Sequence, residues 1–457
     1  MREVTAFDYA QTKDVVVIGA GAAGLAAAIF TRRAAPDLRV TCLDGARRIG
    51  AKILVSGGSR CNVTNRIVTE RDFWGGSSRV VRSVLRAFPA ERAAAFFQSL
   101  GVSLHEEEDG KLFPDTNRSR TVLDALLAEA ARLSIDIECD HRVVGLRTRV
   151  ERGLQPTPVE RGLPPSPRLR RTGQARPAAR RDRFTIEIEG GPLVTARAVV
   201  LATGGRSLPK TGSDGLGYTF AQRMGHGYVE TTPALAPLVL GDKWHSALSG
   251  VSHDARLTLT STGRAAVDLE GSLLWTHFGA SGPVVLNLSR HWHRARIDGS
   301  RAGVTVNVCP RDSFESLEAW WVEQERSRPR AQIASVLATR LPAAVADTWV
   351  GRAGIDRETT MAHVSRDARR RLIHALIETP LDVLDSRGYG YAEVTAGGVP
   401  LEEIDPATME SRVCQGLYLV GEILDVDGRL GGFNFQWAWS SGWVAGQGIA
   451  RALSGRD

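Results

Sequence analysis

Long uninterrupted hydrophobic runs are missing from this sequence of 457 residues. The longest apolar stretch, residues 15–30, contains three glycines and is shorter than the roughly 20 apolar residues that a membrane-spanning helix needs. Three acidic residues, Glu3, Asp8 and Asp14, precede it, unlike the basic start of a secretory leader. We therefore expect a cytoplasmic protein with no membrane partner.

Cysteines are also scarce, and no two of them form a CxxC pair. An odd number of scattered cysteines does not build a disulfide framework. The lack of a CxxC pair argues against a dithiol–disulfide oxidoreductase, whose two thiols lie close together in the sequence. The five cysteines are Cys42, Cys61, Cys139, Cys309 and Cys414.

The formal net charge of +7 does not imply a basic surface, because one segment carries all of it. Residues 152–181 contain eight arginines and one acid, Glu160, so they contribute +8 − 1 = +7 and the rest of the chain is formally neutral. The surrounding segment 150–182 is rich in proline, which continues neither a helix nor a sheet. We expect a disordered loop between two strands there, and we do not expect a nucleic-acid partner.

Residues 14–43 show the pattern of a strand, a turn, a helix and a second strand. Residues 14–18 include a continuous β-branched run, as in a strand that is buried on both faces. Residues 22–34 have the pattern of a helix, and residues 38–43 that of the second strand. Two strands and a helix within about 30 residues predict a parallel, right-handed βαβ unit.

The turn after the first strand reads GAGAAG, a GxGxxG fingerprint in its proper place. Its first glycine permits the tight turn, its second lets the backbone approach a pyrophosphate, and its third lets the helix pack on the strand. The helix N-terminus then offers N–H groups to the phosphates. The alternative is a glycine-rich packing turn. The predicted dinucleotide-binding residues are Gly19, Gly21, Ala22, Ala23 and Gly24, with Asp44 after the second strand to accept hydrogen bonds from a ribose.

Two later strand ends favour FAD over NAD as this dinucleotide. Small residues end a strand at 198–202 and let the chain pass close to a nucleotide, and another buried strand is predicted at 417–420. An FAD domain of the glutathione-reductase type combines motifs near the N-terminus, in mid-chain and near the C-terminus, whereas a nicotinamide dehydrogenase does not need the last strand. The predicted contacts are Ala202, Thr203 and Gly204 at the first strand end and Gly421 and Glu422 at the second.

The segment 50–65 interleaves glycines, polar residues and one thiol directly after Asp44. This composition is typical of a loop that wraps a polar aromatic ring. Lys52 and Arg60 either supply positive charge near N1 and C2=O of the flavin or bind the pyrophosphate. Cys61 is either a redox thiol or a residue chosen for its small size.

The segment 431–436 precedes the last predicted helix, at 434–453. Glycines before a helix expose amide N–H groups, and the helix dipole favours an anion there. We therefore expect Gly432 to lie near the pyrimidine edge of the flavin, where it favours the anionic reduced form. The alternative is a helix that simply docks through its aromatic residues.

His277 is a candidate acid or base in the sequence WTHFGASGP. A single histidine beside aromatic residues is more often a packing residue, so both interpretations stay open.

Together these motifs resemble the BaiN-like (YhiN-like) family of FAD-dependent oxidoreductases, which also includes proteins labelled aminoacetone oxidases. The resemblance is collinear over nearly the whole chain. It implies that the backbone of Val143 contacts the adenine. It also implies that a set of residues lines the flavin, namely Lys52, Arg60, Cys61, Asn62, Thr64 and Asn434. The sequence departs from the family at Ser59, where glycine is common, and in the long segment 150–182.

The resemblance implies an α/β fold: an FAD-binding Rossmann-like domain of the glutathione-reductase type, with an inserted β-barrel domain that carries a helical insertion. The expected FAD-binding domain comprises residues 1–206 and 395–457. The inserted β-barrel comprises 207–311 and 373–394, and its helical insertion 312–372.

We expect an FAD-dependent oxidoreductase that uses NAD(P)H to reduce an activated double bond of a small organic substrate through flavin N5. Only one dinucleotide fingerprint is visible, so NAD(P)H would bind transiently against the flavin. One alternative is an FAD-dependent amine oxidase that uses oxygen. Another is a flavin-bound factor that binds RNA or protein through its arginine-rich loop.

Overall fold

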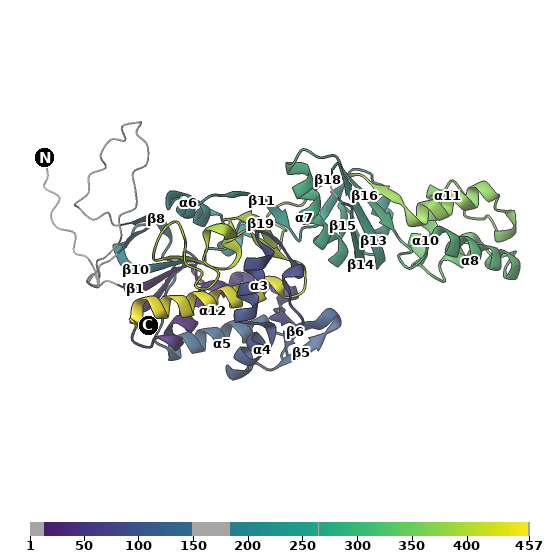
Figure 1. Cartoon of the computed structure of the whole chain (residues 1–457). Helices are drawn as coiled ribbons and strands as arrows, with labels where there is room; N and C mark the ends of the chain where they lie inside the picture. Colours follow the sequence, from purple (N-terminus) through teal and green to yellow (C-terminus); the bar gives the residue numbers. More distant parts are fainter. Residues whose placement is uncertain (1–12, 149–182, 264, 456–457) are drawn as a thin grey trace, which may run out of the picture.

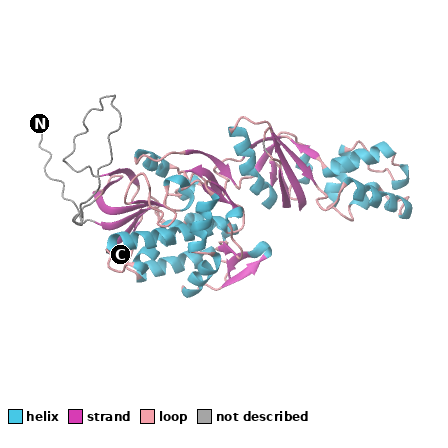
Figure 2. Cartoon of the chain, in the orientation of Figure 1, coloured by secondary structure: helices cyan, strands magenta, loops and turns pink. Residues whose placement is uncertain are grey.

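The computed structural model describes residues 13–148, 183–263 and 265–455. The chain forms an elongated molecule in which a rounded α/β part, a second β-sheet and a group of helices follow one another (Figure 1). Strands gather in two main sheets, and helices cover the first sheet and form the far end of the molecule (Figure 2). Among the described residues no helix is long and apolar enough to cross a membrane.

The first sheet contains the predicted βαβ unit at its centre. Its strand order is β7-β2-β1-β10-β9-β8, and β20 pairs in parallel with the end of β10. The neighbours β7, β2, β1 and β10 are parallel, whereas β8 and β9 are antiparallel additions. The strands are β1 (Lys13–Ile18), β2 (Val40–Leu43), β7 (Asp136–Glu138), β8 (Val143–Thr148), β9 (Phe184–Ile188), β10 (Leu193–Leu201) and β20 (Leu417–Leu419).

Two helices rich in small residues pack closely on each other, and the first of them also packs on this sheet. They are α1 (Ala22–Ala34) and α12 (Phe433–Ser454). A Cβ atom at Gly442 of α12 would lie 2.7 Å from Cβ of Ala26 in α1, so glycine is needed for this close approach. Two further helices lie near the first sheet: α5 (Ser119–Arg132), which contacts α1, and α6 (Leu216–Arg223), which contacts β8.

Residues 78–99 form two helices rather than one. They are α3 (Ser78–Ala87) and α4 (Ala90–Ser99), and Pro89 separates them. Proline has no N–H to donate and its ring clashes with the preceding turn, so a single helix through this position is excluded. Two small sheets lie nearby: β3 (Thr64–Asn65), β6 (Lys111–Pro114) and β5 (Leu104–Glu107) form one, and β4 (Phe73–Gly75) and β21 (Val426–Gly428) the other.

The inserted part is built on a second, antiparallel sheet with the order β17-β16-β13-β14-β15-β12-β18. The helix α7 (Pro283–Ile297) packs against it, and buried Trp275 and Trp292 belong to its core. The strands are β12 (Leu238–Leu240), β13 (Ser252–Ser261), β14 (Val267–Thr276), β15 (Gly279–Ser281), β16 (Ala302–Asn307), β17 (Thr379–Leu381) and β18 (Val383–Ser386).

A group of helices extends from this sheet and shares its hydrophobic core through Trp321 and Trp349. The helix α11 ends at Ile377, so the expected boundary at 372 lies inside a helix and moves to 377. The helices are α8 (Phe314–Ser327), α9 (Ile333–Leu337), α10 (Ala343–Arg352) and α11 (Arg366–Ile377).

The chain crosses between the two parts twice, and the two crossings pair with each other. β11 (Val229–Ala234) leads out and β19 (Val394–Gly398) leads back, and Ala234 lies opposite Val394. A buried ion pair adds a second connection, because Arg290 of α7 donates to Asp427 of β21 through Nε (2.5 Å) and Nη2 (2.9 Å).

Candidate functional site

A large cavity, of about 1330 Å³, lies at the carboxyl ends of the parallel strands β1, β2, β10 and β20. Ligands of open α/β sheets bind at this edge. The cavity continues from the strand ends to the two crossings that lead to the inserted part, where Leu235 and Tyr391 line it. Its volume exceeds the roughly 300–1,000 Å³ of an ordinary ligand pocket, so it has room for a cofactor and a second molecule.

The three fingerprint glycines differ in their surroundings. Gly19 has a left-handed φ of +101°, and a Cβ there would lie 2.4 Å from the carbonyl oxygen of Ala202. A Cβ at Gly24 would lie 1.9 Å from the carbonyl oxygen of Gly19, and Gly24 does not line the cavity. A Cβ at Gly21 would meet no protein atom within 4 Å, because this position opens to the cavity. Gly21 is therefore the fingerprint glycine whose backbone is open to the cavity.

Asp44 follows β2 and is held by two backbone hydrogen bonds. Its Oδ2 accepts from Ala20 N at 2.8 Å and its Oδ1 accepts from Ala46 N at 2.8 Å. These bonds fix the carboxylate at the cavity wall, with lone pairs left for hydroxyl groups of a bound ribose. The other expected nucleotide contacts, namely Ala22, Ala23, Val143, Ala202, Thr203 and Gly204, also line the cavity.

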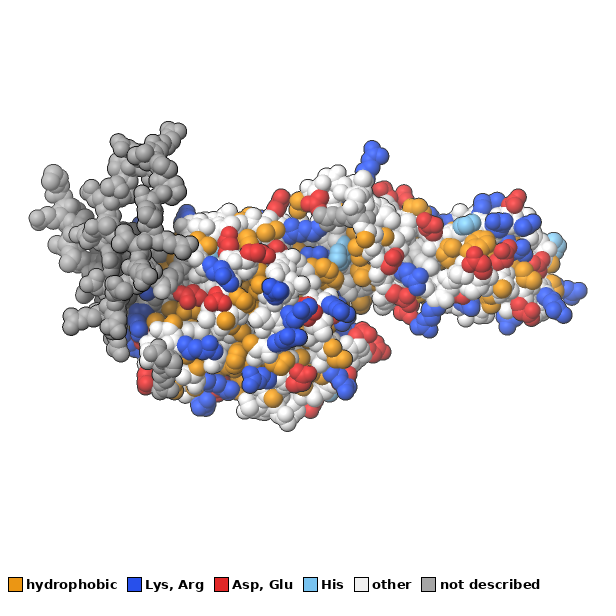
Figure 3. All heavy atoms as spheres, in the orientation of Figure 1, with side chains coloured by type: hydrophobic (Ala, Val, Ile, Leu, Met, Phe, Trp, Pro, Cys, Tyr) orange, Lys and Arg blue, Asp and Glu red, His pale blue; other side chains and the backbone are white. Residues whose placement is uncertain are grey.

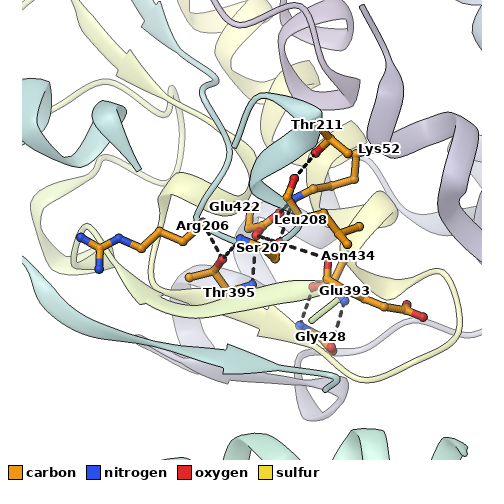
Figure 4. Close-up of polar contacts among 10 residues, drawn as sticks. All are labelled: Lys52, Arg206, Ser207, Leu208, Thr211, Glu393, Thr395, Glu422, Gly428 and Asn434. Carbon is orange, nitrogen blue, oxygen red and sulfur yellow. Dashed lines mark hydrogen bonds and ion pairs between the residues drawn. The ribbon is translucent and has the colours of Figure 1, made fainter. Parts of the chain in front are cut away.

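Lys52 belongs to a hydrogen-bonded cluster that joins four separate parts of the chain (Figure 4). Its Nζ donates to Glu422 Oε2 and to Ser207 Oγ, both at 2.8 Å. Glu422 Oε1 accepts from Ser207 Oγ at 2.7 Å and from Thr395 N at 2.9 Å. Lys52 and Glu422 line the cavity with their charges paired.

Ser207 and Thr395 were not predicted from the sequence. Both are fully buried members of this cluster. Thr395 Oγ1 accepts from the backbone N of Arg206 and Ser207, at 2.8 and 3.0 Å. Their position beside strand ends, after β10 and within β19, is the only signal that the sequence offered.

The segment 50–65 forms the helix α2 (Ala51–Ser59) and a tight turn. Four successive or nearly successive residues adopt a left-handed backbone, namely Gly57, Gly58, Ser59 and Cys61. Ser59 has a φ of +66°, which explains why glycine suits this position. Arg60 and Asn62 line the cavity. Arg60 pairs with Glu107 at 2.6 Å and lies over the ring of Phe113, so its charge is already compensated.

Two expected flavin contacts from this segment do not line the cavity. Cys61 is fully buried, and burial raises the pKa of its thiol to about 12, which leaves it protonated and unreactive at neutral pH. The redox role considered for Cys61 is therefore not supported. Thr64 is also fully buried, and its Oγ1 donates to Gln436 Oε1 at 2.6 Å.

The N-terminus of α12 faces the cavity. Gly432 has a left-handed φ of +91°, and a Cβ there would lie 2.6 Å from Thr64 C and O. Gly432, Asn434 and Gly421 all line the cavity. The Asn434 amide is engaged with the backbone of Gly428, at 2.8 and 2.9 Å. The N–H groups of the first turn of α12 have no partner within the helix and favour an anion at this end of the cavity.

His277 lies away from this site. It is exposed in the turn between β14 and β15, beside Phe278, and it does not line the cavity. The prediction of His277 as a catalytic acid or base is therefore not supported for a reaction in this cavity.

These features define a flavoprotein-type site: a glycine turn open to the cavity, a carboxylate fixed at the cavity wall, and a second helix N-terminus that faces the same cavity. The profile of the family described as "HI0933-like protein Rossmann domain" matches residues 13–157 and 169–448. The chain belongs to this family, which confirms the resemblance seen in the sequence motifs. It is an FAD-dependent oxidoreductase.

Relatives with two different names are similar over nearly their whole length. The chain is 30% identical to a "3-dehydro-bile acid delta(4,6)-reductase" of Clostridium scindens, over 95% of this chain and 98% of that protein. It is 30% identical to a "Ribosomal RNA dihydrouridine synthase" of Haemophilus influenzae and 31% identical to one of Escherichia coli. Each of these two comparisons covers 96% of this chain and 99% of the relative.

Proposed function

We propose that this protein reduces a carbon–carbon double bond conjugated to a carbonyl group, with NAD(P)H as the electron donor and FAD as the resident cofactor. The observation that carries the proposal is the size of the cavity, which extends past the dinucleotide features to Leu235 and Tyr391 and leaves room for a substrate. The names of the relatives agree in this chemistry. A 3-oxo bile acid with Δ4,6 bonds and the pyrimidine ring of uridine both contain such a conjugated bond.

The residues present fit FAD. Gly21 and the N-terminus of α1 would hold the pyrophosphate, Asp44 the adenosine ribose, and Val143 the adenine. Lys52 and the N-terminus of α12 would lie near the flavin ring, where a positive dipole end favours negative charge on the reduced form. FAD supplies hydride transfer through N5 when it is bound.

The electron donor is tested by anaerobic bleaching of the flavin. We expect NADH or NADPH to bleach the yellow protein, and 2-cyclohexen-1-one then to restore the colour without oxygen. The variant Gly21→Ala, loaded with as much FAD as it retains, is the control for free flavin. The proposal fails if neither nicotinamide reduces the bound flavin, or if the reduced flavin persists with every conjugated acceptor.

A uridine in ribosomal RNA is the second candidate substrate. The names of two relatives favour it. An aromatic and cationic pair beside the cavity also favours it, because the guanidinium of Arg387 lies 3.5 Å from the ring centre of the half-exposed Tyr391. Aromatic rings and guanidinium groups are side chains on which nucleobases stack. Elsewhere on the face drawn in Figure 3, cationic and acidic side chains are interspersed. A ribosomal RNA transcript that reoxidises the reduced flavin and gains dihydrouridine would establish this substrate over a small enone.

The two alternatives from the sequence have their own tests. Bleaching by an amine alone, with peroxide formed in air, would favour the amine oxidase. The arginine-rich loop 150–182 lies outside the described residues. Its role as a binding segment is tested by deleting 152–181 and measuring retention on RNA, which should fall only if that hypothesis is right.

A further inference from the structure

Four acidic side chains line the cavity, and three of them are already engaged. Asp44 accepts two backbone hydrogen bonds, Asp214 pairs with Arg142, and Glu422 accepts from Lys52, Ser207 and Thr395. Glu393 also lines the cavity, but its carboxyl group makes no hydrogen bond or ion pair within the described residues. It is therefore the one cavity carboxyl group in the described part of the chain that is free to act on a bound molecule.

The backbone around Glu393 is held firmly at the point where the inserted part joins the FAD-binding part. Glu393 N donates to the carbonyl oxygen of Leu235 at 3.2 Å, and its own carbonyl oxygen accepts from Ser207 Oγ at 3.2 Å. Its side chain points away from the cluster formed by Lys52, Glu422 and Ser207 (Figure 4). A carboxyl group on a fixed backbone is presented to the substrate end of the cavity.

The surroundings of Glu393 favour its protonated form. The Glu393 side chain is exposed to the cavity. The protein atoms around the carboxyl group still reduce the hydration of its charged form, and this raises the pKa above its ordinary value. No charged side chain contributes to this shift. A bound cofactor and substrate would remove more water from the cavity and raise the pKa further.

Few other groups that could donate a proton lie at the substrate end of the cavity. No histidine or cysteine lines the cavity within the described residues. Lys52 is engaged with Glu422. Tyr391 is a hydroxyl donor at the crossings, where Arg387 lies on its ring.

We propose that Glu393 is the catalytic residue that donates the proton in the reduction of the conjugated double bond. This inference rests on the proposed function. Addition of hydride to the β-carbon leaves an enolate, and the α-carbon then needs a proton. The O–H bond of the Glu393 carboxyl group breaks as the new C–H bond forms at the α-carbon. The resulting carboxylate takes a proton from water before the next turnover, and NAD(P)H supplies the two electrons.

The test separates the two half-reactions in the FAD-loaded protein. The variants are Glu393→Gln and Tyr391→Phe, with Glu378→Gln as the matched control, since Glu378 is exposed on the inserted part. Flavin is first reduced with dithionite, and its anaerobic reoxidation by 2-cyclohexen-1-one is then followed. We expect Glu393→Gln to slow reoxidation at least about 100-fold, the usual contribution of a positioned general acid. Reduction by dithionite and the flavin potential should not change.

The rate of flavin reoxidation should depend on pH in one direction. Donation needs the protonated carboxyl group, so the wild-type rate should fall as pH rises through the raised pKa of Glu393. In Glu393→Gln this fall should disappear. A second measurement does not depend on turnover: the infrared C=O band of the protonated acid, taken as the difference between the wild type and Glu393→Gln, should persist well above the ordinary glutamic acid pKa of about 4.3.

Two outcomes would overturn the proposal. One is a Glu393→Gln variant that reoxidises at the wild-type rate while Tyr391→Phe loses the activity. The other is a Glu393 band that titrates at the ordinary value. If wild-type reduced flavin is not reoxidised by 2-cyclohexen-1-one or by ribosomal RNA, the proposed function itself fails, and the infrared titration still decides whether Glu393 holds its proton.

Discussion

The two glycines Gly21 and Gly24 lie three residues apart, and substitution of each by alanine should change a different property of the protein. Gly21 has an ordinary backbone, with φ −78° and ψ −166°, and its Cβ would point into the cavity. Gly24 has no such space, because its Cβ would lie 1.9 Å from the carbonyl oxygen of Gly19. The first change should therefore affect the cofactor, and the second the fold.

The expected magnitudes follow from these contacts. Gly21→Ala alters the N-cap of α1 and should cost about 0.5–1 kcal/mol of folding free energy. Its methyl group would enter the space that we propose for the pyrophosphate, so FAD should bind at least about tenfold more weakly, or about 1.4 kcal/mol. Gly24→Ala forces α1 away from the turn. Overpacking of this kind costs about 1–3 kcal/mol and here should reach the upper end or beyond.

The assay compares the apo and FAD-loaded forms of each variant. Thermal unfolding of the apo proteins measures the fold, and quenching of FAD fluorescence on titration measures the affinity. Apo Gly21→Ala should melt close to the wild type and bind FAD poorly. Apo Gly24→Ala should melt well below the wild type or fail to accumulate. Wild-type FAD affinity in Gly21→Ala, or wild-type stability in Gly24→Ala, would refute the assignment of these positions.

Three further predictions concern the ion pair, the strained turn and the buried thiol. Arg290→Met leaves Asp427, 1% exposed, without its partner and should destabilise the protein by about 3–5 kcal/mol in thermal unfolding; a loss below 1 kcal/mol would contradict a structural role for the pair. Ser59→Gly should stabilise the protein by about 1 kcal/mol because it relieves a left-handed backbone, whereas Ser59→Ala should give no gain; equal effects of the two variants would contradict this cause. Cys61, with a thiol pKa of about 12, should be only about one part in ten thousand thiolate at pH 8 and so escape iodoacetamide in the native protein. Its reactivity should appear after denaturation, as peptide mass spectrometry would show, and rapid native labelling would exclude the burial seen here.

The sequence by itself determined the nucleotide-binding core. The strand, turn and helix at 13–34 are contiguous, so their pattern of β-branched residues, glycines and alanines needs no knowledge of the rest of the fold. The position of Asp44 follows in the same way, because it ends the next strand of the same unit.

Only the tertiary structure decided which chemical groups reach the cavity. Arg60 is compensated by Glu107, and Lys52 by Glu422, which lies far away in the sequence. Cys61 is turned into the core by a left-handed backbone, while Glu393 is brought to the cavity by pairing between the two crossings. Charge compensation and burial depend on contacts between distant segments, and local patterns of residues do not encode them.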